Sequence, residues 1–399
     1  MRPSPDAPDP ASGGGPPPTA ITLRGVRKEF AGAAAPAVSD LSLDIFEGEI
    51  VALVGPSGCG KTTTLKMINR LVEPTSGSIT VLGEDQAALP AHELRRRIGY
   101  VIQQIGLFPH RSVRRNIGVV PELLGWDRKR IDARSDELAD LVGLDRSLLD
   151  RYPSELSGGQ QQRAGVARAL AADPPILLMD EPYSAVDPIV RERLQDDLLD
   201  LQATVRKTIV IVTHDIDEAV KLADRVAILD VGGVLEQYAT PDELLSDPAS
   251  DFVASFLGRE RGLRRLALRT VAEVDPGDGP TTRPDDRCAV AIDAMDRHDM
   301  PWAAVIDDGC LVGWVDRADA AATPSSPVSA LPLHDFVSVV TPSTPLREAL
   351  DVIVNAHSRA AVVVEDAATV DGAAVGASAT RPRRYLGLIT IDEIAGGLT

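Results

Sequence analysis

The chain has 399 residues, with 41 lysines and arginines against 59 aspartates and glutamates, which gives a formal net charge of −18. This length exceeds what one hydrophobic core normally organises, so we expect two or more domains. The acidic balance argues against nucleic acid as a partner, and three widely spaced cysteines exclude a disulfide framework or a zinc site and favour a reducing compartment.

Residues 1–19 contain seven prolines, three consecutive glycines and almost no large apolar side chain. Such a segment cannot offset the entropy of ordering by burial, so we predict a disordered tail. Residues 21–23 and 41–45 alternate between apolar and polar side chains, which is typical of strands in a partly exposed sheet. No apolar run approaches the roughly 20 residues that span a bilayer, so any membrane role must pass through a partner.

Three short, continuous apolar runs follow, at residues 50–54, 176–179 and 209–212. Runs of this kind predict strands that are buried on both faces, as in a parallel sheet. Helical stretches separate them, so we expect an α/β domain with a mainly parallel sheet.

Residues 55–62 read Gly-Pro-Ser-Gly-Cys-Gly-Lys-Thr and fit the phosphate-loop pattern at every fixed position. The motif lies between the predicted strand 50–54 and a helical pattern at 63–68, a context that a chance glycine-rich turn would lack. Glycine lets backbone N–H groups surround phosphate oxygens, and a helix N-terminus adds partial positive charge. We therefore expect Lys61 to reach the β- and γ-phosphates of a nucleotide and Thr62 to ligate Mg²⁺.

Polar side chains follow the other predicted strands. Asp180 and Glu181 end one apolar run, Gln103 follows residues 98–102, and His214 follows residues 208–213. Because the carboxyl ends of parallel strands meet at one edge of the sheet, these side chains are expected to converge on a ligand there. Asp180 could bind Mg²⁺ directly or through water, and Glu181 could polarise an attacking water.

Residues 156–163 read Leu-Ser-Gly-Gly-Gln-Gln-Gln-Arg, which resembles the signature sequence of the ABC transporter ATPases. The resemblance covers residues 20–258 and includes the family's hallmarks in order. It implies a P-loop ABC-type nucleotide-binding domain, with a mainly parallel sheet, an antiparallel β subdomain and a helical subdomain at about residues 104–165. Two such domains would pair head to tail and enclose two ATP molecules, so a second copy of the chain is an expected partner. Ser157 also has the position of a helix N-cap.

The resemblance implies a role for each motif. Glu181 would be the general base, His214 would contact the γ-phosphate, and Gln103 would be the third catalytic residue. Thr62, Gln103 and Asp180 would hold Mg²⁺. The residues implied to contact ATP are Phe30, Gly55, Pro56, Ser57, Gly58, Cys59, Gly60, Lys61, Thr62 and Thr63 of one copy and Ser157, Gly158, Gly159, Gln160 and Asp187 at the dimer interface. Phe30 would stack on adenine, although a phenylalanine in the core fits the pattern nearly as well.

One phosphate loop and one signature, with no coiled-coil pattern between them, argue against the translation-factor and DNA-repair members of the family and leave importer ATPases. Residues 101–110 and 179–189 resemble the glycine betaine, carnitine and choline importers, with Tyr183 and Val186 where that group usually has Phe and Leu. This implies an ATPase that energises import of such compatible solutes through an integral-membrane permease. An extracytoplasmic binding protein would deliver the solute, and the ATPase would lie at the cytoplasmic face of the plasma membrane. An importer for an amino acid or anion, and a regulatory nucleotide-binding protein without a transport role, are the alternatives.

Residues 259–399 contain an internal repeat. The segments that echo each other are 303–308 with 360–366, and 311–315 with 385–389. The second copy carries extra residues at 367–384, which we expect to form a hairpin loop. Helical stretches at 291–298 and 346–356 precede the two copies.

This repeat, at about residues 266–322 and 330–399, resembles a tandem CBS pair, an α+β module that can bind adenine nucleotides or cyclic dinucleotides. Thr390 and Glu393 would belong to the ribose and phosphate element of the second copy. Asp316 occupies the equivalent place in the first copy, where an acid would repel phosphate. A dimerisation module without a ligand is the alternative.

Overall fold

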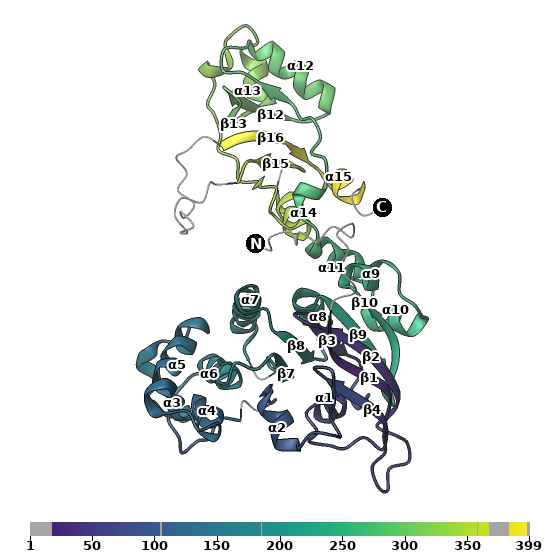
Figure 1. The fold of residues 1–399 in the computed structure, drawn as a ribbon. Helices are drawn as coiled ribbons and strands as arrows, with labels where there is room; N and C mark the ends of the chain where they lie inside the picture. Colours follow the sequence, from purple (N-terminus) through teal and green to yellow (C-terminus); the bar gives the residue numbers. More distant parts are fainter. Residues whose placement is uncertain (1–17, 104–105, 185, 357, 367–382, 397–399) are drawn as a thin grey trace. The chain divides into compact units, whose positions relative to one another are not determined.

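The computed structural model describes residues 18–103, 106–184, 186–356, 358–366 and 383–396. Contacts within the chain divide it into two compact units, the first ending at Arg259 and the second beginning at Glu260 (Figure 1). Most of the predicted tail, residues 1–17, lies outside the described residues. Thr19 was placed in that tail but belongs to the first strand, because it pairs with Phe46.

A four-stranded antiparallel sheet contains the predicted strands at 21–23 and 41–45, which are confirmed. Its order is β2-β1-β4-β5, with bounds Val38–Phe46, Thr19–Lys28, Ser76–Val81 and Glu84–Asp85. Leu23 pairs with Leu43 on one side and with Ile79 on the other, and all three are buried. The apolar face of this sheet therefore contributes to the core of the first unit.

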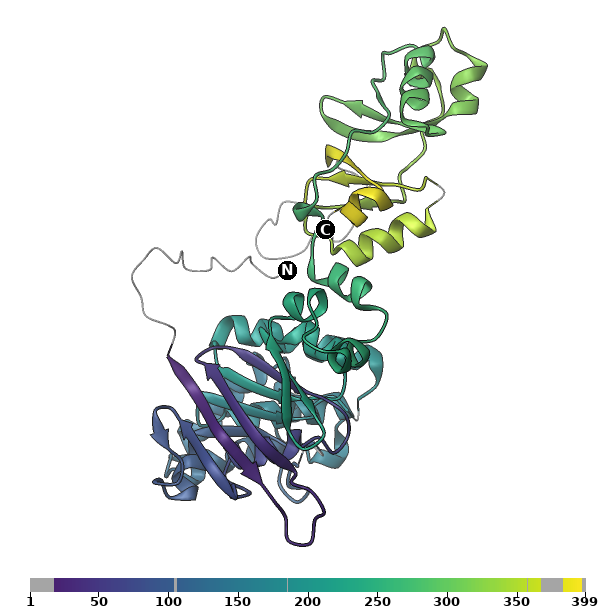
Figure 2. The same cartoon turned by 90° about the vertical axis from the view of Figure 1, so that its right-hand side faces the viewer.

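The second sheet of this unit has the order β10-β9-β3-β8-β7-β6. The bounds are Val234–Ala239, Arg225–Asp230, Ile50–Val54, Thr208–Val212, Ile176–Asp180 and Ile98–Val101. The three predicted buried strands are β3, β7 and β8, and all their residues are buried, as expected. All strands but β10 run parallel, so the carboxyl ends of β3, β6, β7 and β8 share one edge. Both sheets contribute to one hydrophobic core. Figure 2 shows β1 and β2, in purple, beside the teal strands of the parallel sheet, and β2 contacts β10.

Helices cover the parallel sheet, with α1 packed against β7 and β8, α6 against β6, and α8 against β3. The bounds are Lys61–Ile68 for α1, Ala91–Arg96 for α2, Gly158–Leu170 for α6, Pro188–Val205 for α7, Ile216–Leu222 for α8, Pro241–Ser246 for α9 and Asp251–Leu257 for α10. The helical pattern predicted at 63–68 is confirmed as α1.

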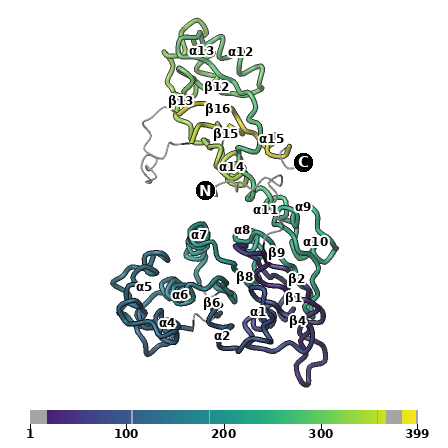
Figure 3. The backbone as a smooth tube through the Cα atoms, in the orientation of Figure 1, coloured from purple at the N-terminus to yellow at the C-terminus, as the bar shows by residue number. Residues whose placement is uncertain are grey.

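A helical subdomain is inserted between β6 and β7. It contains α3 (Val113–Ile117), α4 (Val119–Leu123), α5 (Arg128–Leu141), the 3-10 turns η1 (Arg146–Leu148) and η2 (Pro153–Glu155), and α6. In Figure 3 the labels α4, α5 and α6 lie together beside the sheet, and α5 contacts both other helices.

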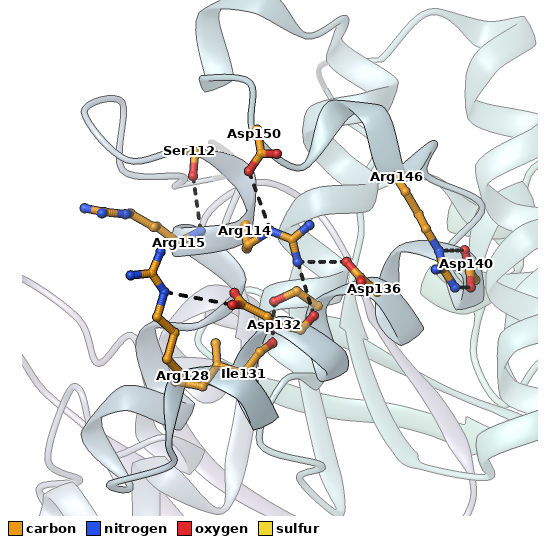
Figure 4. A network of polar contacts seen from close by, with 11 residues as sticks. Ser112, Arg114, Arg115, Arg128, Ile131, Asp132, Asp136, Asp140, Arg146 and Asp150 are labelled. Atoms are coloured by element: carbon orange, nitrogen blue, oxygen red, sulfur yellow. Dashed lines mark hydrogen bonds and ion pairs between the residues drawn. The ribbon is translucent and has the colours of Figure 1, made fainter.

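Arg114 of α3 connects the parts of this subdomain (Figure 4). Its Nη1 lies 2.7 Å from Oδ1 of Asp136 and donates to the carbonyl oxygen of Asp132 over 3.2 Å, both in α5. Its Nε lies 3.6 Å from Oδ1 of Asp150, in the segment that leads to α6. The Arg114 side chain is 23% exposed and that of Asp136 36%, so this pair is less screened by water than a surface ion pair, whereas Asp150 is 86% exposed. They tie α3 to α5 and to the chain before the signature.

The second unit is built on one six-stranded sheet of order β11-β12-β13-β16-β15-β14. The bounds are Thr281–Thr282, Trp302–Asp307, Cys310–Asp316, Arg383–Ile389, Ala361–Val364 and Val339–Val340. Its helices are α11 (Arg261–Leu268), η3 (Val271–Glu273), α12 (Cys288–His298), α13 (Arg317–Ala322), η4 (Val328–Ala330), α14 (Leu346–Asn355) and α15 (Ile391–Gly396).

The two halves of this sheet repeat each other in mirror order. In each half a short strand pairs parallel with the next strand, which then pairs antiparallel with the third. The halves join where Leu311 pairs with Arg383 and Cys310 with Arg384. Arg383 and Arg384 therefore belong to β16, so the prediction of a loop was wrong for these two residues. The rest of the predicted loop, residues 367–382, lies outside the described residues. Each half has its own hydrophobic core, and a third cluster includes residues of both.

Throughout the described ranges, every helix is too short or too polar to cross a bilayer.

Candidate nucleotide-binding site

The loop between β3 and α1 has a backbone that only glycine can adopt. Gly55 has a φ of 151° and Gly60 a φ of 99°. A Cβ on Gly55 would lie 2.1 Å from the carbonyl oxygen of Leu229, and one on Gly60 would lie 2.4 Å from that of Ala37. The glycines of the motif therefore let the loop pack against β9 and the segment before β2.

Lys61 and Thr62 are the first residues of α1. The Lys61 side chain is buried, and its Nζ donates to the carbonyl oxygens of Gly55 over 2.7 Å and of Pro56 over 3.0 Å. The Thr62 hydroxyl donates a 2.8 Å hydrogen bond to Oδ1 of Asp180, the last residue of β7. Burial raises the pKa of the Asp180 carboxyl, and the hydrogen bond from Thr62 opposes this shift. An ammonium group, a hydroxyl and a buried carboxylate thus share this edge of the sheet.

Glu181, which follows β7, contacts side chains that follow β6 and β8. Its Oε2 accepts a 2.9 Å hydrogen bond from Nε2 of Gln103 and lies 3.5 Å from Nδ1 of His214. The backbone of Glu181 has a φ of 45°, in the left-handed region, which is costly for a residue other than glycine. The structure therefore brings Gln103, Glu181 and His214 together from β6, β7 and β8.

The other loop residues differ in exposure. Ser57 and Gly58 are exposed, whereas Pro56 and Thr63 are half-buried. Cys59 is fully buried in the core, so any contact of this residue with a phosphate would have to come from its backbone rather than its thiol.

Phe30 lies after the end of β1 and is 47% exposed, with the Lys28 Nζ 5.1 Å from its ring centroid. Phe30 is therefore not a core residue, and part of its surface is free for stacking. The alternative interpretation of Phe30 as a core phenylalanine is therefore wrong.

The signature residues form the start of α6. The Ser157 hydroxyl accepts from the N–H of Gln160 over 3.4 Å, and Oε1 of Gln160 accepts from the N–H of Ser157 over 2.9 Å. This capping box confirms Ser157 as an N-cap and leaves Gly158 exposed, with Gly159 and Gln160 partly exposed. Asp187 caps α7 by accepting from the N–H of the second residue along that helix.

Within the described part of the chain, no hydrogen bond or ion pair joins the signature residues or Asp187 to the phosphate loop. The site residues thus fall into two groups, one at the edge of the parallel sheet and one at the starts of α6 and α7.

Glu218 is a buried carboxyl near this site that sequence reasoning missed. It lies in the first turn of α8 and is 4% exposed, and its Oε1 has no hydrogen-bond partner among the described residues. Burial raises the pKa of Glu218 to about 7, and a hydrogen bond with Thr213 opposes the shift. In the sequence it reads as an ordinary acidic residue at a helix start, so nothing there signalled its burial.

Residues 106–108 are held by two side chains that carried no sequence signal. Asn116 is fully buried, and its amide donates to the carbonyl oxygen of Phe108 over 3.1 Å and accepts from the Phe108 N–H over 2.7 Å. Nη1 of Arg168 in α6 donates to the carbonyl oxygen of Gly106 over 2.5 Å. Phe108 itself remains 42% exposed. Hydrogen bonds thus anchor the backbone at Gly106 and Phe108, and the Phe108 ring is presented at the surface.

A buried parallel strand, a glycine-rich loop, a helix and a carboxylate pair on a nearby parallel strand together define a P-loop nucleotide-binding domain. Comparison with known proteins assigns the chain to the same class of protein.

The ABC transporter family model matches residues 38–184. The osmoprotectant import ATP-binding protein OsmV of Salmonella typhimurium is 53% identical over 306 residues, which are 75% of this chain and 80% of that protein. The glycine betaine/carnitine/choline transport ATP-binding protein OpuCA of Bacillus subtilis is 51% identical over 282 residues, which are 70% of this chain and 74% of that protein.

Among solved structures, the dimeric bacterial ABC transporter cassette MJ0796 superposes with a TM-score of 0.50 at 34% identity, and covers 55% of this chain and 98% of its own. It has also been solved in a dimeric post-hydrolysis state bound to ADP and Pi. The chain belongs to the ABC transporter ATP-binding proteins, in the family of osmoprotectant importers.

Proposed function

We propose that this chain hydrolyses ATP to drive import of compatible solutes of the quaternary-amine type, such as glycine betaine, choline or carnitine, through a membrane permease. The observation that carries the proposal is the convergence of Gln103, Glu181 and His214 beside a complete phosphate loop. Over 70–75% of its length the chain is about half identical to ATP-binding proteins named for osmoprotectant import and for glycine betaine, carnitine and choline transport.

ATP would bind with its phosphates in the loop between β3 and α1. Backbone N–H groups and Lys61 would neutralise the β- and γ-phosphates, and Phe30 would stack on adenine. The donor set fits Mg²⁺, because a buried carboxylate (Asp180), a hydroxyl (Thr62) and an amide (Gln103) supply the oxygen ligands that this ion prefers. When bound, Mg²⁺ would neutralise charge that develops on the phosphates.

Glu181 would act as the general base that accepts a proton from the attacking water. Gln103 donates to the carboxylate oxygen of Glu181 and so holds it in one orientation. His214, on the other side of Glu181, would donate a hydrogen bond to the γ-phosphate. The left-handed backbone of Glu181 is consistent with a residue held in place for function.

Two copies would be needed for a complete site. The exposed start of α6, with Ser157 to Gln160, and Asp187 at the start of α7 would act on the nucleotide held by the other copy. The separation of these residues from the phosphate loop supports this arrangement, as does the dimeric state of MJ0796.

The partner in the membrane would be an integral permease, itself supplied by an extracytoplasmic binding protein, with this chain at the cytoplasmic face. The surface around Phe108 suits the docking of a permease helix, because Asn116 and Arg168 hold it rigid while its ring stays exposed. The second unit would be a tandem CBS pair that regulates this activity, and its mirror-ordered halves support this proposal.

Reconstitution in proteoliposomes with the permease and binding protein tests the function. ATP hydrolysis and solute uptake should rise together when choline, carnitine or glycine betaine is added. Stimulation by an amino acid or anion alone would favour the alternative importer. ATPase activity that never depends on the permease would favour a regulatory protein without a transport role. The Glu181→Gln variant, assembled in the same way, is the control for ATP-independent uptake.

A further inference from the structure

The second unit contains a cavity of about 550 Å³ between its two halves. Its walls come from the start of β12, the end of β13, the segment 335–338 before β14, and the last turns of α14 with Ala356 and Ser358. Both copies of the repeat therefore contribute to a single site.

Three aromatic rings line one side of this cavity. The ring centroids of Trp302 and Phe336 lie 5.4 Å apart in an edge-to-face arrangement, and those of Trp314 and Phe336 lie 6.4 Å apart. Both indole N–H groups are already used, because Trp302 donates to the carbonyl oxygen of Ser358 and Trp314 to that of Asp335. Trp302 is 4% exposed, and the Trp314 ring also contacts His334, with 4.6 Å between centroids. What the rings offer a ligand in the cavity is therefore the remaining π surface rather than hydrogen bonds, and π systems attract cations.

The charged groups of the lining are all acidic. Asp316, Asp335 and Asp351 line the cavity, and no lysine, arginine or histidine does so within the described ranges. None of the three forms an ion pair in the described structure. Asp316 and Asp351 are oriented by local hydrogen bonds, one from the N–H of Ala318 and one from the amide of Asn355. Arg317, which follows Asp316 in the chain, pairs with Asp296 instead.

The ligand class follows from this chemistry. A nucleotide or cyclic dinucleotide would bring phosphate charge to three carboxylates, with no cationic side chain among the described residues that line the cavity, which is unfavourable. A small cation with an apolar shell suits both the rings and the carboxylates.

We propose that this cavity binds a small organic cation whose ammonium group carries methyl groups, such as choline. The methyl groups contact the rings of Trp302, Trp314 and Phe336, and the positive charge is balanced by Asp316, Asp335 and Asp351. A zwitterion of similar size binds more weakly, because its carboxylate meets the same three acids. The binding depends only on this unit and is independent of ATP hydrolysis and transport.

Calorimetric titration of the full chain with choline, without ATP, tests the proposal. One saturable site is expected, with at least about tenfold weaker binding of 3,3-dimethyl-1-butanol, a neutral molecule of the same shape, and weaker binding of glycine betaine. Trp302 and Trp314 are two of only three tryptophans, so choline should also change the intrinsic fluorescence.

Two variants and a matched control locate the site. Trp314→Leu should weaken choline binding about tenfold or more, and Asp335→Asn about fivefold. Asp308→Asn removes a carboxylate from the β12–β13 turn outside the cavity and should leave the affinity unchanged. Asp335 is exposed, so its variant should fold even if the tryptophan variant does not.

Three results would overturn the proposal: no saturable choline binding, equal binding of the neutral molecule, or equal loss in the Asp308 control. Saturable binding of AMP or a cyclic dinucleotide in place of choline would assign the cavity to nucleotides instead.

Discussion

The side-chain amide of Gln103 donates a 2.9 Å hydrogen bond to the carboxylate of Glu181, although 78 residues separate them in the chain. The contact exists because β6 and β7 are adjacent parallel strands, so residues just beyond their carboxyl ends meet. His214 reaches the same carboxylate from β8. The geometry makes Glu181 the central residue of the proposed chemistry and the first target for substitution.

Replacing Glu181 with glutamine should lower ATP turnover by about 10²–10⁴-fold, because an amide cannot accept the proton from water. ATP binding should persist, because Lys61 and the loop backbone are untouched. Steady-state hydrolysis and equilibrium ATP binding measure the two quantities. Glu137→Gln on the exposed face of α5 is the matched control and should retain full activity. Unchanged turnover in Glu181→Gln would refute its role as the base.

Gly60 should be required for the packing of the phosphate loop even when no nucleotide is bound. Gly60→Ala places a methyl group 2.4 Å from the carbonyl oxygen of Ala37 at a φ of 99°, and should destabilise the first unit by about 2–4 kcal/mol. Gly83 has a φ of 80° but no atom near its Cβ position, so Gly83→Ala should cost only about 1 kcal/mol. Urea unfolding without nucleotide compares the two, and equal effects would contradict the packing argument.

The stability of the first unit should depend on the ionisation of Glu218. Its pKa is about 7 in the folded chain and near the ordinary 4.5 when unfolded, so the folded state holds the proton more tightly. The contribution of Glu218 to the free energy of unfolding is therefore fully present below about pH 4.5. It is lost as the pH rises through 7, and the loss amounts to about 3 kcal/mol.

The Glu218→Gln variant cannot ionise at this position, so its free energy of unfolding should not show this decrease between pH 5 and 7. At pH 8 the variant should be more stable than the native chain. Urea midpoints of the same transition at several pH values provide the measurement. Glu192→Gln, an exposed carboxyl in α7, should keep the native profile. A native profile in Glu218→Gln would show that another group is responsible.

The helical subdomain should depend on Arg114 far more than on its neighbour Arg128. Arg114→Met removes the partly buried contacts to Asp136 and to the carbonyl oxygen of Asp132, and should destabilise the first unit by about 1–3 kcal/mol, with faster amide exchange in α3 and α5. Arg128 is 89% exposed and 3.9 Å from Asp132, so Arg128→Met should cost less than about 0.5 kcal/mol. Similar losses in both variants would refute the bridging role of Arg114.

Much of the nucleotide site was open to prediction because its signals are local in sequence. The glycines at 55 and 60 and the lysine at 61 belong to one motif, and each strand carries its polar residue just after its apolar run. Parallel pairing then requires those residues to meet, so the meeting of Gln103, Glu181 and His214 could be expected before the structure was known. The repeat in residues 259–399 was likewise visible in the sequence.

Burial and long-range contact could not be predicted in the same way. Cys59 sits in a loop motif yet lies in the core, and Glu218 looks like a surface acid yet is buried against the parallel sheet. Asn116 has no pattern around it, and its role depends on where the backbone of Phe108 passes.

The sequence alone indicated a P-loop nucleotide-binding domain that resembles the ABC type, and a C-terminal module with an internal repeat. The first conclusion rests on short motifs and on apolar runs, and the second on segments that echo each other. Only the tertiary structure decided that Phe30 is exposed, that Arg383 and Arg384 pair with β13, and that aromatic rings and carboxylates from both repeats enclose one cavity. The physical reason is that side-chain burial, strand pairing and the lining of a cavity depend on which elements come close together in space. The sequence around one residue does not show which distant residues will lie beside it.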